Sequence, residues 1–166
     1  HRSGTWTPGL SAEEQATLFA IADDTLKWCV RGRPGRFDMT IYRLTPKLKT
    51  VLATFVTLKI HGELRGCIGS LEACEPLYLS VHNNAVNAAL SDPRFSPLRQ
   101  EELPDVRMNV SILSPLTAIA GPEEFQVGRH GIILSKGGRR SVFLPEVAID
   151  QKWTREETLA NLSLKA

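Results

Sequence analysis

The stretch His61-Gly62-Glu63-Leu64-Arg65-Gly66-Cys67-Ile68-Gly69-Ser70 is the most informative part of this chain of 166 residues. It directly follows an apolar, β-branched run, so it is expected to form the second strand of a hairpin. Glycine within a strand usually marks a bulge or a place where another part of the molecule approaches the backbone closely. The stretch therefore predicts a hairpin strand whose glycines shape a site around Arg65 and Cys67.

The register of this hairpin decides which side chains accompany Cys67. A two-residue turn at His61-Gly62, with Gly62 at positive φ, would place Val56 opposite Cys67 and Leu58 opposite Arg65. A three-residue turn would reverse the two faces of the second strand. The sequence leaves both registers open.

Three further segments carry helical signals. Ser11 and Glu14 form a capping box, and an apolar stripe follows, which predicts a helix over residues 12–30. Pro76 is well placed as the first residue of a second helix, whose buried stripe is Leu77, Val81, Ala85, Ala88 and Ala89. A second capping box, Thr154 with Glu157, predicts a C-terminal helix with Leu159 and Leu162 facing inward.

Two more segments carry strand signals. Residues 106–112 alternate between apolar and polar side chains, as in a half-buried strand. Residues 128–145 are predicted to form a hairpin with its turn at Lys136-Gly137-Gly138. Residues 37–50 are expected to be a loop with a short helix, and residues 1–10 to be flexible. Helices interspersed with hairpins favour a single α+β domain over residues 1–166, with a largely antiparallel sheet flanked by helices.

Composition excludes several classes of protein. Hydrophobic residues make up 42% of the chain and charged residues 23%, which is typical of a soluble globular protein. No apolar run reaches the roughly 20 residues that span a membrane. A formal charge of +2 makes nucleic acid an unlikely partner. Three cysteines in a chain that needs no disulfides predict reduced thiols in the cytoplasm.

Cys67 is the candidate nucleophile. Arg65 could stabilise its thiolate, and the backbone amides of residues 66–70 could hold an anion. Acid–base partners could be His82 or His130, oriented by Glu63 or Asn109. Cysteine is also among the residues most often buried, so a packing role for Cys67 stands beside the catalytic one. The spacing of cysteines and histidines predicts no metal site, and no motif predicts a cofactor.

A longer pattern resembles the AMMECR domain family, the AMME-syndrome critical-region proteins. It begins with LRGCIG at 64–69 and covers nearly the whole chain. The other matching segments are NAVNAA at 84–89, DPRF at 92–95 with Pro97, VSILSP at 110–115, HGIIL at 130–134, GGRR at 137–140, FLP at 143–145 and LSLKA at 162–166. Two positions depart from the family pattern. Asn109 stands where many members have an acidic residue, and Ser163 stands where they have a cysteine.

The resemblance implies a larger and a smaller subdomain with a cleft between them. The residues expected to line this cleft beside Cys67 and Arg65 are Gly66, Gly69, Asn84, Asp92, Arg94 and Phe95. It also implies a prokaryotic relative, protein A of the AmmeMemoRadiSam system, which is associated with a Memo-like protein and a radical-SAM protein. The resemblance names no reaction.

Two main functions are compatible with these features. In the first, the protein is an accessory component that binds a Memo-like or radical-SAM partner. In the second, it is an enzyme that acts on a small anionic substrate with Cys67 as thiolate. A third interpretation makes the signature architectural, with Arg65 pairing Asp92 and Cys67 filling space.

Overall fold

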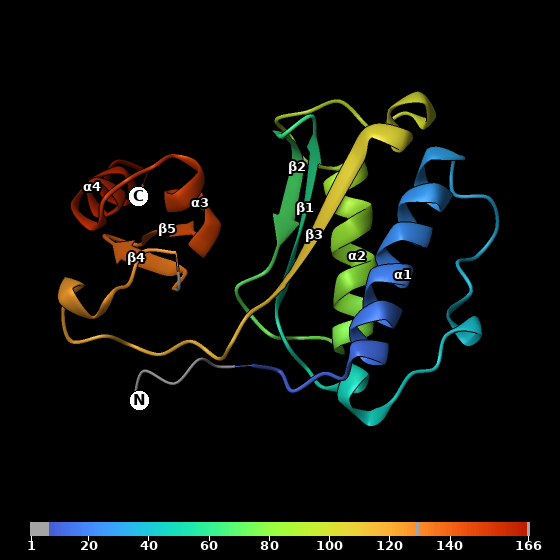
Figure 1. Ribbon diagram of the computed structural model, residues 1–166, viewed down its shortest axis with the longest axis horizontal. Helices are drawn as coiled ribbons and strands as arrows, with labels where there is room; N and C mark the ends of the chain where they lie inside the picture. The colour runs from blue at the N-terminus through green and yellow to red at the C-terminus, as the bar shows by residue number, and fades with distance from the viewer. Residues whose placement is uncertain (1–6, 129, 166) are drawn as a thin grey trace. The chain divides into compact units, whose positions relative to one another are not determined.

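The computed structural model describes residues 7–128 and 130–165 and shows two compact units, His1–Pro115 and Leu116–Ala166. The first unit consists of a three-stranded antiparallel sheet and two long helices (Figure 1). The second contains a two-stranded hairpin and two shorter helices. The predicted α+β class with antiparallel sheets is therefore confirmed. The flexible stretch predicted at residues 1–10 falls partly on residues 1–6, which lie outside the described residues.

Helix α1, Ala12–Val30, begins and ends where the capping box and stripe predict. Ser11 Oγ accepts the Glu14 amide at 3.1 Å, and the Glu14 carboxylate accepts the Ser11 amide at 3.0 Å. Both bonds satisfy amides that the first helical turn leaves without partners. This local signal explains why the start of α1 can be predicted from sequence.

The three-stranded sheet has the order β2-β1-β3, with strands β1 Thr54–Ile60, β2 Glu63–Gly69 and β3 Val106–Ile112. The β1–β2 turn has two residues, His61 and Gly62, both with positive φ. The pairing of Val56 with Cys67 that was expected for a two-residue turn is nevertheless wrong, because the register shifts by one between Leu58 and Lys59. This bulge places Cys67 opposite Thr57 instead of Val56. From Gly66 onward, the side chains of β2 therefore lie on the faces that a three-residue turn would have given them.

Helix α2, Leu77–Leu90, packs against β1 and β2, and α1 packs beside it (Figure 1). Pro76 is the residue before the first helical one, since its carbonyl accepts the Leu79 and Ser80 amides. The predicted buried stripe of α2 is confirmed. Its residues join a core that also holds Leu18, Leu26, Val56 and Leu58.

Short 3₁₀ helices fill most of the connections. The loop expected over residues 37–50 contains η1, Met39–Ile41, and η2, Pro46–Lys49. Helix η3, Gln100–Asp105, precedes β3 and was not predicted, because its six residues show no apolar periodicity. It matters below because it carries Glu102.

The second unit is built on the predicted hairpin, with strands β4 Ile132–Lys136 and β5 Arg139–Phe143 around the Gly137-Gly138 turn. Helix η4, Pro122–Glu124, precedes the hairpin, and α3, Pro145–Asp150, follows it. Helix α4, Arg155–Lys165, starts at the predicted capping box. It is fastened to β5 where Ser141 Oγ donates to the Leu162 carbonyl at 2.7 Å.

Candidate functional site

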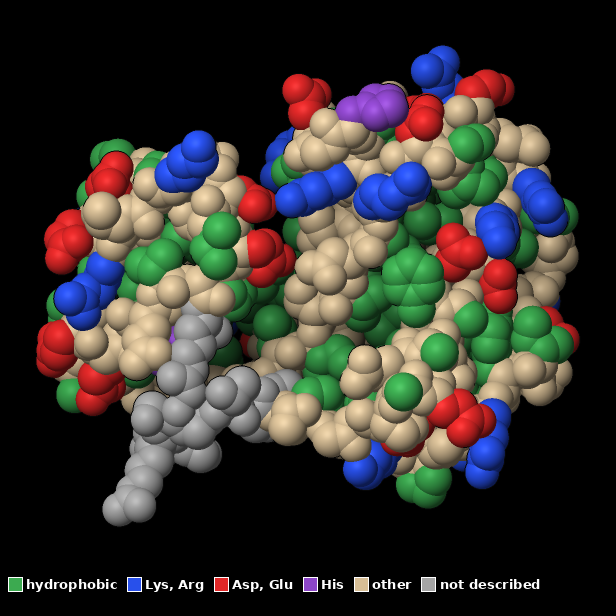
Figure 2. All heavy atoms as spheres, viewed as in Figure 1, with side chains coloured by type: hydrophobic (Ala, Val, Ile, Leu, Met, Phe, Trp, Pro, Cys, Tyr) green, Lys and Arg blue, Asp and Glu red, His purple; other side chains and the backbone are tan. Residues whose placement is uncertain are grey.

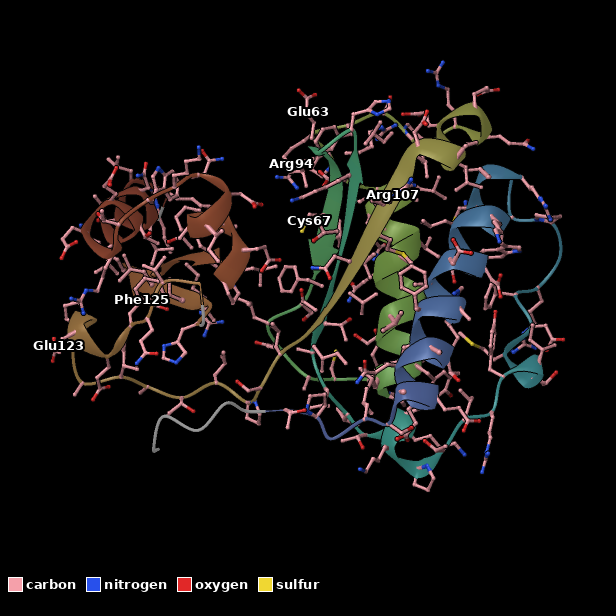
Figure 3. The ribbon with its side chains drawn as sticks, viewed as in Figure 1. Glu63, Cys67, Arg94, Arg107, Glu123 and Phe125 are labelled. Carbon is pink, nitrogen blue, oxygen red and sulfur yellow. The ribbon has the colours of Figure 1, made fainter. Side chains whose placement is uncertain are left out.

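Cys67 lies on an edge strand, and its backbone is capped by side chains from the loop after α2. Its amide donates to Asp92 Oδ2 at 2.9 Å, and its carbonyl accepts Arg94 Nη2 at 3.3 Å. Figure 3 shows Arg94 and Cys67 at the same edge of the sheet. Asp92 and Arg94 therefore take the place of a neighbouring strand at this point of β2.

Asp92 is a buried carboxylate that is fully committed to this cap. It is 4% exposed and accepts the Arg94 guanidinium through both oxygens, at 3.0 and 2.8 Å. The Arg94 amide adds a third donor at 3.1 Å. The Arg94 guanidinium, followed by the Cys67 and Arg94 amides, holds the pKa of Asp92 well below its usual range. Asp92 is thus a fixed anion that positions the backbone of Cys67.

Arg65, the bulged residue of β2, pairs with Glu102 of η3. Its Nε and Nη2 donate to the two carboxylate oxygens at 2.8 and 3.1 Å, a bidentate geometry with both side chains mostly buried. This pairing lowers the pKa of Glu102 to about 2. The expectation that Arg65 would pair with Asp92 is wrong, because Arg94 occupies that carboxylate.

Phe95 connects the two arginines. The guanidinium of Arg65 lies 5.8 Å from the centre of its ring and that of Arg94 5.5 Å. Of these two arginines, Arg94 contacts the Cys67 backbone and Arg65 ties β2 to η3.

The side chain of Cys67 lies on the sheet face opposite the helices. Its Sγ is 3.3 Å from Thr57 Oγ1, and the register places Asn109 on the other side of Thr57. The row before it holds Leu64, Lys59 and Arg107, and the row after it Gly69, Phe55 and Ser111. We call these three rows the Cys67 face.

Sequence reasoning did not identify Thr57, Lys59 or Arg107 as neighbours of Cys67. The bulge that aligns them with Cys67 leaves no local signature in the sequence, although the glycine at 66 pointed to one. Lys59 and Arg107 are opposite each other in the register of β1 and β3, but the Arg107 guanidinium lies at the edge of β3, where Nη1 donates to the Pro104 and Val106 carbonyls at 3.4 and 3.2 Å. The face therefore offers a thiol, hydroxyl groups and an amide, which suit a polar ligand.

Three other predicted cleft residues serve packing within the first unit. A Cβ on Gly66 would lie 2.3 Å from the Ala88 carbonyl oxygen, so only glycine permits this approach. A Cβ on Gly69 would lie 2.3 Å from the Phe55 ring. Asn84 is buried, and its amide donates to Thr54 O at 3.0 Å and Thr54 Oγ1 at 2.9 Å.

Among the residues that the structure describes, no histidine of the first unit is recorded in contact with Cys67. His82 lies on the helical side of the sheet and bonds Thr25 Oγ1 at 2.8 Å, and burial lowers its pKa. Thr25 donates its only hydroxyl proton to the Ile21 carbonyl, so His82 Nδ1 is the donor. His130 belongs to the second unit, where its Nδ1 accepts the Gln126 amide at 3.1 Å. A catalytic role for His130 stays a prediction.

Other candidate sites in the described residues are weak. Among residues 7–128 and 130–165, no three His, Cys, Asp or Glu side chains gather as metal ligands. No described helix is both long and apolar enough to cross a membrane. Two surface hollows of the described residues hold 460 and 250 Å³. The first lies at the start of α1 and the second between α1 and β3, so neither includes Cys67.

Comparisons with known proteins agree with the resemblance in the sequence. The AMMECR1 family model matches residues 20–166. A protein of Methanothermobacter thermautotrophicus is 36% identical over 95% of this chain and 84% of its own length, and one of Pyrobaculum islandicum is 44% identical over 93% and 73%. The match to Protein MK0488 of Methanopyrus kandleri, at 38% identity, covers 74% of this chain but only 63% of that protein.

The fold is also found in a solved structure. The crystal structure of the uncharacterized protein PH0010 from Pyrococcus horikoshii superposes with a TM-score of 0.80 at 31% identity, covering 90% of this chain and 77% of that one. The chain therefore belongs to the AMMECR1 family.

Proposed function

We propose that this protein is an accessory binding component that works with a Memo-like protein and a radical-SAM protein, and that the Cys67 face is its contact surface. The observation that carries the proposal is how the signature side chains are used. Asp92 and Arg94 hold each other and the backbone of Cys67, and Arg65 holds Glu102. These groups shape a surface, and their charges are already paired.

The Cys67 face has the composition of a contact surface. Leu64 is 40% exposed although it is a large apolar residue on a strand, and Arg107 and Asn109 are exposed beside it. An apolar side chain set among polar and cationic groups is typical of protein–protein contacts. We expect a partner that offers an apolar side chain to Leu64 and acidic groups to the exposed Arg107.

The proposal is tested by titration calorimetry, which measures binding of the purified 166-residue chain to a Memo-like and to a radical-SAM protein from the same organism. Leu64→Glu should weaken binding at least tenfold, because it puts a charge on the contact surface. Ile41→Glu is the matched control, since Ile41 is 69% exposed on η1, which is not part of the Cys67 face. Absence of binding to both proteins, or equal weakening by the two variants, would contradict the proposal.

A second candidate function, a thiol enzyme for a small anionic substrate, is favoured by one observation. The thiol of Cys67 is only half-buried, and the Arg94 guanidinium bonds its carbonyl. Because Arg65 is held by Glu102 and Arg94 by Asp92, such a substrate would depend on the exposed Arg107 for positive charge.

The enzyme hypothesis is tested by the pH dependence of alkylation of each cysteine, followed by peptide mapping. Cys29 is an internal reference, since burial raises the pKa of its thiol to about 11, and Cys74 is the exposed reference. The ordinary pKa of a cysteine thiol is about 8.5. The enzyme hypothesis would be supported if alkylation of Cys67 persists well below that pH and slows in Arg94→Gln. Alkylation of Cys67 no faster than that of Cys74 at every pH would exclude a stabilised thiolate.

A further inference from the structure

The turn of the β4–β5 hairpin consists of two glycines without side chains around them. Gly137 and Gly138 both have positive φ, as in the type I′ turn that joins two antiparallel strands tightly. A Cβ built on either glycine would meet no atom within 4 Å, so the turn projects into open space. The ladder of β4 and β5 ends at the pair Lys136–Arg139 and does not use the amides of the two glycines. The tip of the hairpin is therefore narrow, and its backbone is open to a ligand.

Three cations surround this turn. Lys136, Arg139 and Arg140 are exposed, and none of them forms an ion pair with another described residue. Neither β4 nor β5 contains an acidic residue. In the first unit, by contrast, basic side chains lie among acidic ones on the visible face (Figure 2). The formal charge of +2 for the whole chain conceals this local excess of positive charge.

The register places two of these charges against each other. Lys136 and Arg139 are directly opposite in the ladder, and like charges in such a pair destabilise a hairpin. An anion bound between them would remove this repulsion. The amides of Gly137 and Gly138 are further donors at the same tip, and backbone amides commonly contact phosphate oxygens. The tip therefore has the chemistry of a phosphate-binding surface.

The cations lie on both faces of the hairpin. Side chains alternate along a strand, so Lys136 and Arg139 share one face with Ser141, and Arg140 lies on the other. The first of these faces is directed toward α4, since Ser141 Oγ bonds the Leu162 carbonyl. A ligand that meets all three cations must have negative charge on both sides of the tip. An acidic segment of a partner protein, lying against one face, would not meet them all.

The major groove of B-form DNA has the required geometry. It is about 12 Å wide, admits a two-stranded β-ribbon and has phosphates along both walls. We propose that the β4–β5 tip binds double-stranded DNA by entering this groove, where Lys136 and Arg139 contact phosphates of one wall and Arg140 those of the other. The Gly-Gly turn has no side chain to read base edges, so the binding is independent of sequence. The proposal concerns the second unit and does not depend on the function of the Cys67 face.

Salt-dependent DNA binding tests the proposal. Fluorescence anisotropy of a short labelled DNA duplex is measured as the 166-residue chain is added at increasing salt concentrations. Three phosphate contacts give a slope of about −3 for the logarithm of the association constant against the logarithm of the salt concentration. The variant Lys136→Gln/Arg139→Gln/Arg140→Gln should bind about tenfold more weakly or worse at low salt and should flatten this slope. Its circular dichroism should be unchanged, because all three side chains are exposed.

A second triple variant, Arg31→Gln/Arg33→Gln/Arg36→Gln, is the matched control. It removes the same number of charges from exposed arginines in the loop after α1, which belongs to the first unit. Its affinity for DNA should stay within about twofold of the wild type, because these arginines contact no phosphate in the proposed complex. A duplex of RNA should bind more weakly than DNA, since side chains cannot enter its deep and narrow major groove.

Four results would overturn the proposal. The first is a wild type that shows no salt-dependent binding of duplex DNA. The second is equal weakening by the two triple variants, which would make the total charge responsible and not the tip. The third is binding of duplex RNA as tight as that of DNA, which excludes entry into the major groove. The fourth is binding of polyglutamate but not of DNA, which would identify the tip as a contact for an acidic protein.

Discussion

The two edges of the three-stranded sheet are finished differently. At the β2 edge, Asp92 and Arg94 satisfy the amide and carbonyl of Cys67, and Arg65 fastens the strand to Glu102. At the β3 edge, the Val106 amide donates to Leu103 O and its carbonyl accepts Arg107 Nη1 at 3.2 Å. The pairing of Asn109 with Thr57 directs the backbone groups of Met108, Val110 and Ile112 away from β1. The difference shows that the LRGCIG and DPRF segments act together: Asp92 and Arg94 of the second satisfy the backbone of Cys67 in the first, so the edge of β2 is capped at this point.

The largest expected effect comes from Gly66→Val at the closed edge. The new Cβ would lie 2.3 Å from the Ala88 carbonyl oxygen in α2, and a backbone atom cannot move aside cheaply. We expect a loss of about 3 kcal/mol or more in the free energy of unfolding, measured by urea denaturation. Cys67→Ser keeps the backbone and should cost about 1 kcal/mol. Equal losses would show that the thiol, not the close approach, matters at this edge.

Asp92→Asn comes next. The NH₂ group of the asparagine side chain would face an N–H group that now donates to Asp92, so that hydrogen bond would be lost. Arg94 would also lose its counter-charge. Because the carboxylate is buried, the expected loss is about 3 kcal/mol of unfolding free energy. Amide hydrogen exchange should also speed up at Cys67, whose N–H is held by Asp92. The control is Asp38→Asn, since Asp38 caps the short exposed helix η1. Unchanged exchange at Cys67 would break the claim that Asp92 closes the edge.

The elements around this edge also show how much of the fold and of the site can be predicted from sequence. The helix α1, the strand at 106–112 and the second hairpin were predicted because their signals are local: a capping box, an alternation, a Gly-Gly turn. The side of the sheet on which the Cys67 side chain lies could not be predicted, because the single bulged residue Arg65 reverses it. Sequence identified the charged residues Arg65, Asp92 and Arg94. It did not give their partners, because Glu102 lies 37 residues from Arg65 on an unpredicted 3₁₀ helix.

A smaller effect is expected in the acid dependence of stability. Arg65 lowers the pKa of Glu102 from its ordinary 4.5 to about 2 in the folded protein. The contribution of the pair is therefore complete above pH 4.5 and is lost as the pH falls from 4.5 toward 2. Glu102→Gln should lower stability at pH 6 and leave a flatter decline between pH 5 and pH 3, measured by urea denaturation. Glu101→Gln, at the exposed neighbouring position, should keep the wild-type decline. A wild-type decline in Glu102→Gln would mean that the Arg65 clamp adds nothing to this edge.

The smallest effect belongs to the open edge. Asn109 is exposed and its backbone bonds to β1 do not depend on its side chain, so Asn109→Ala should change the free energy of unfolding by no more than about 0.5 kcal/mol in dilute protein. Thermal unfolding monitored by circular dichroism at the lowest practical concentration isolates the monomer. A loss above about 1 kcal/mol would mean that β3 needs its side chains for the fold as β2 does, and the two edges would then differ only in their partners. A change within the expected range sharpens the contrast, because a side chain at the centre of β3 could then be removed without cost to the fold, whereas Gly66 and Asp92 at the β2 edge could not be replaced.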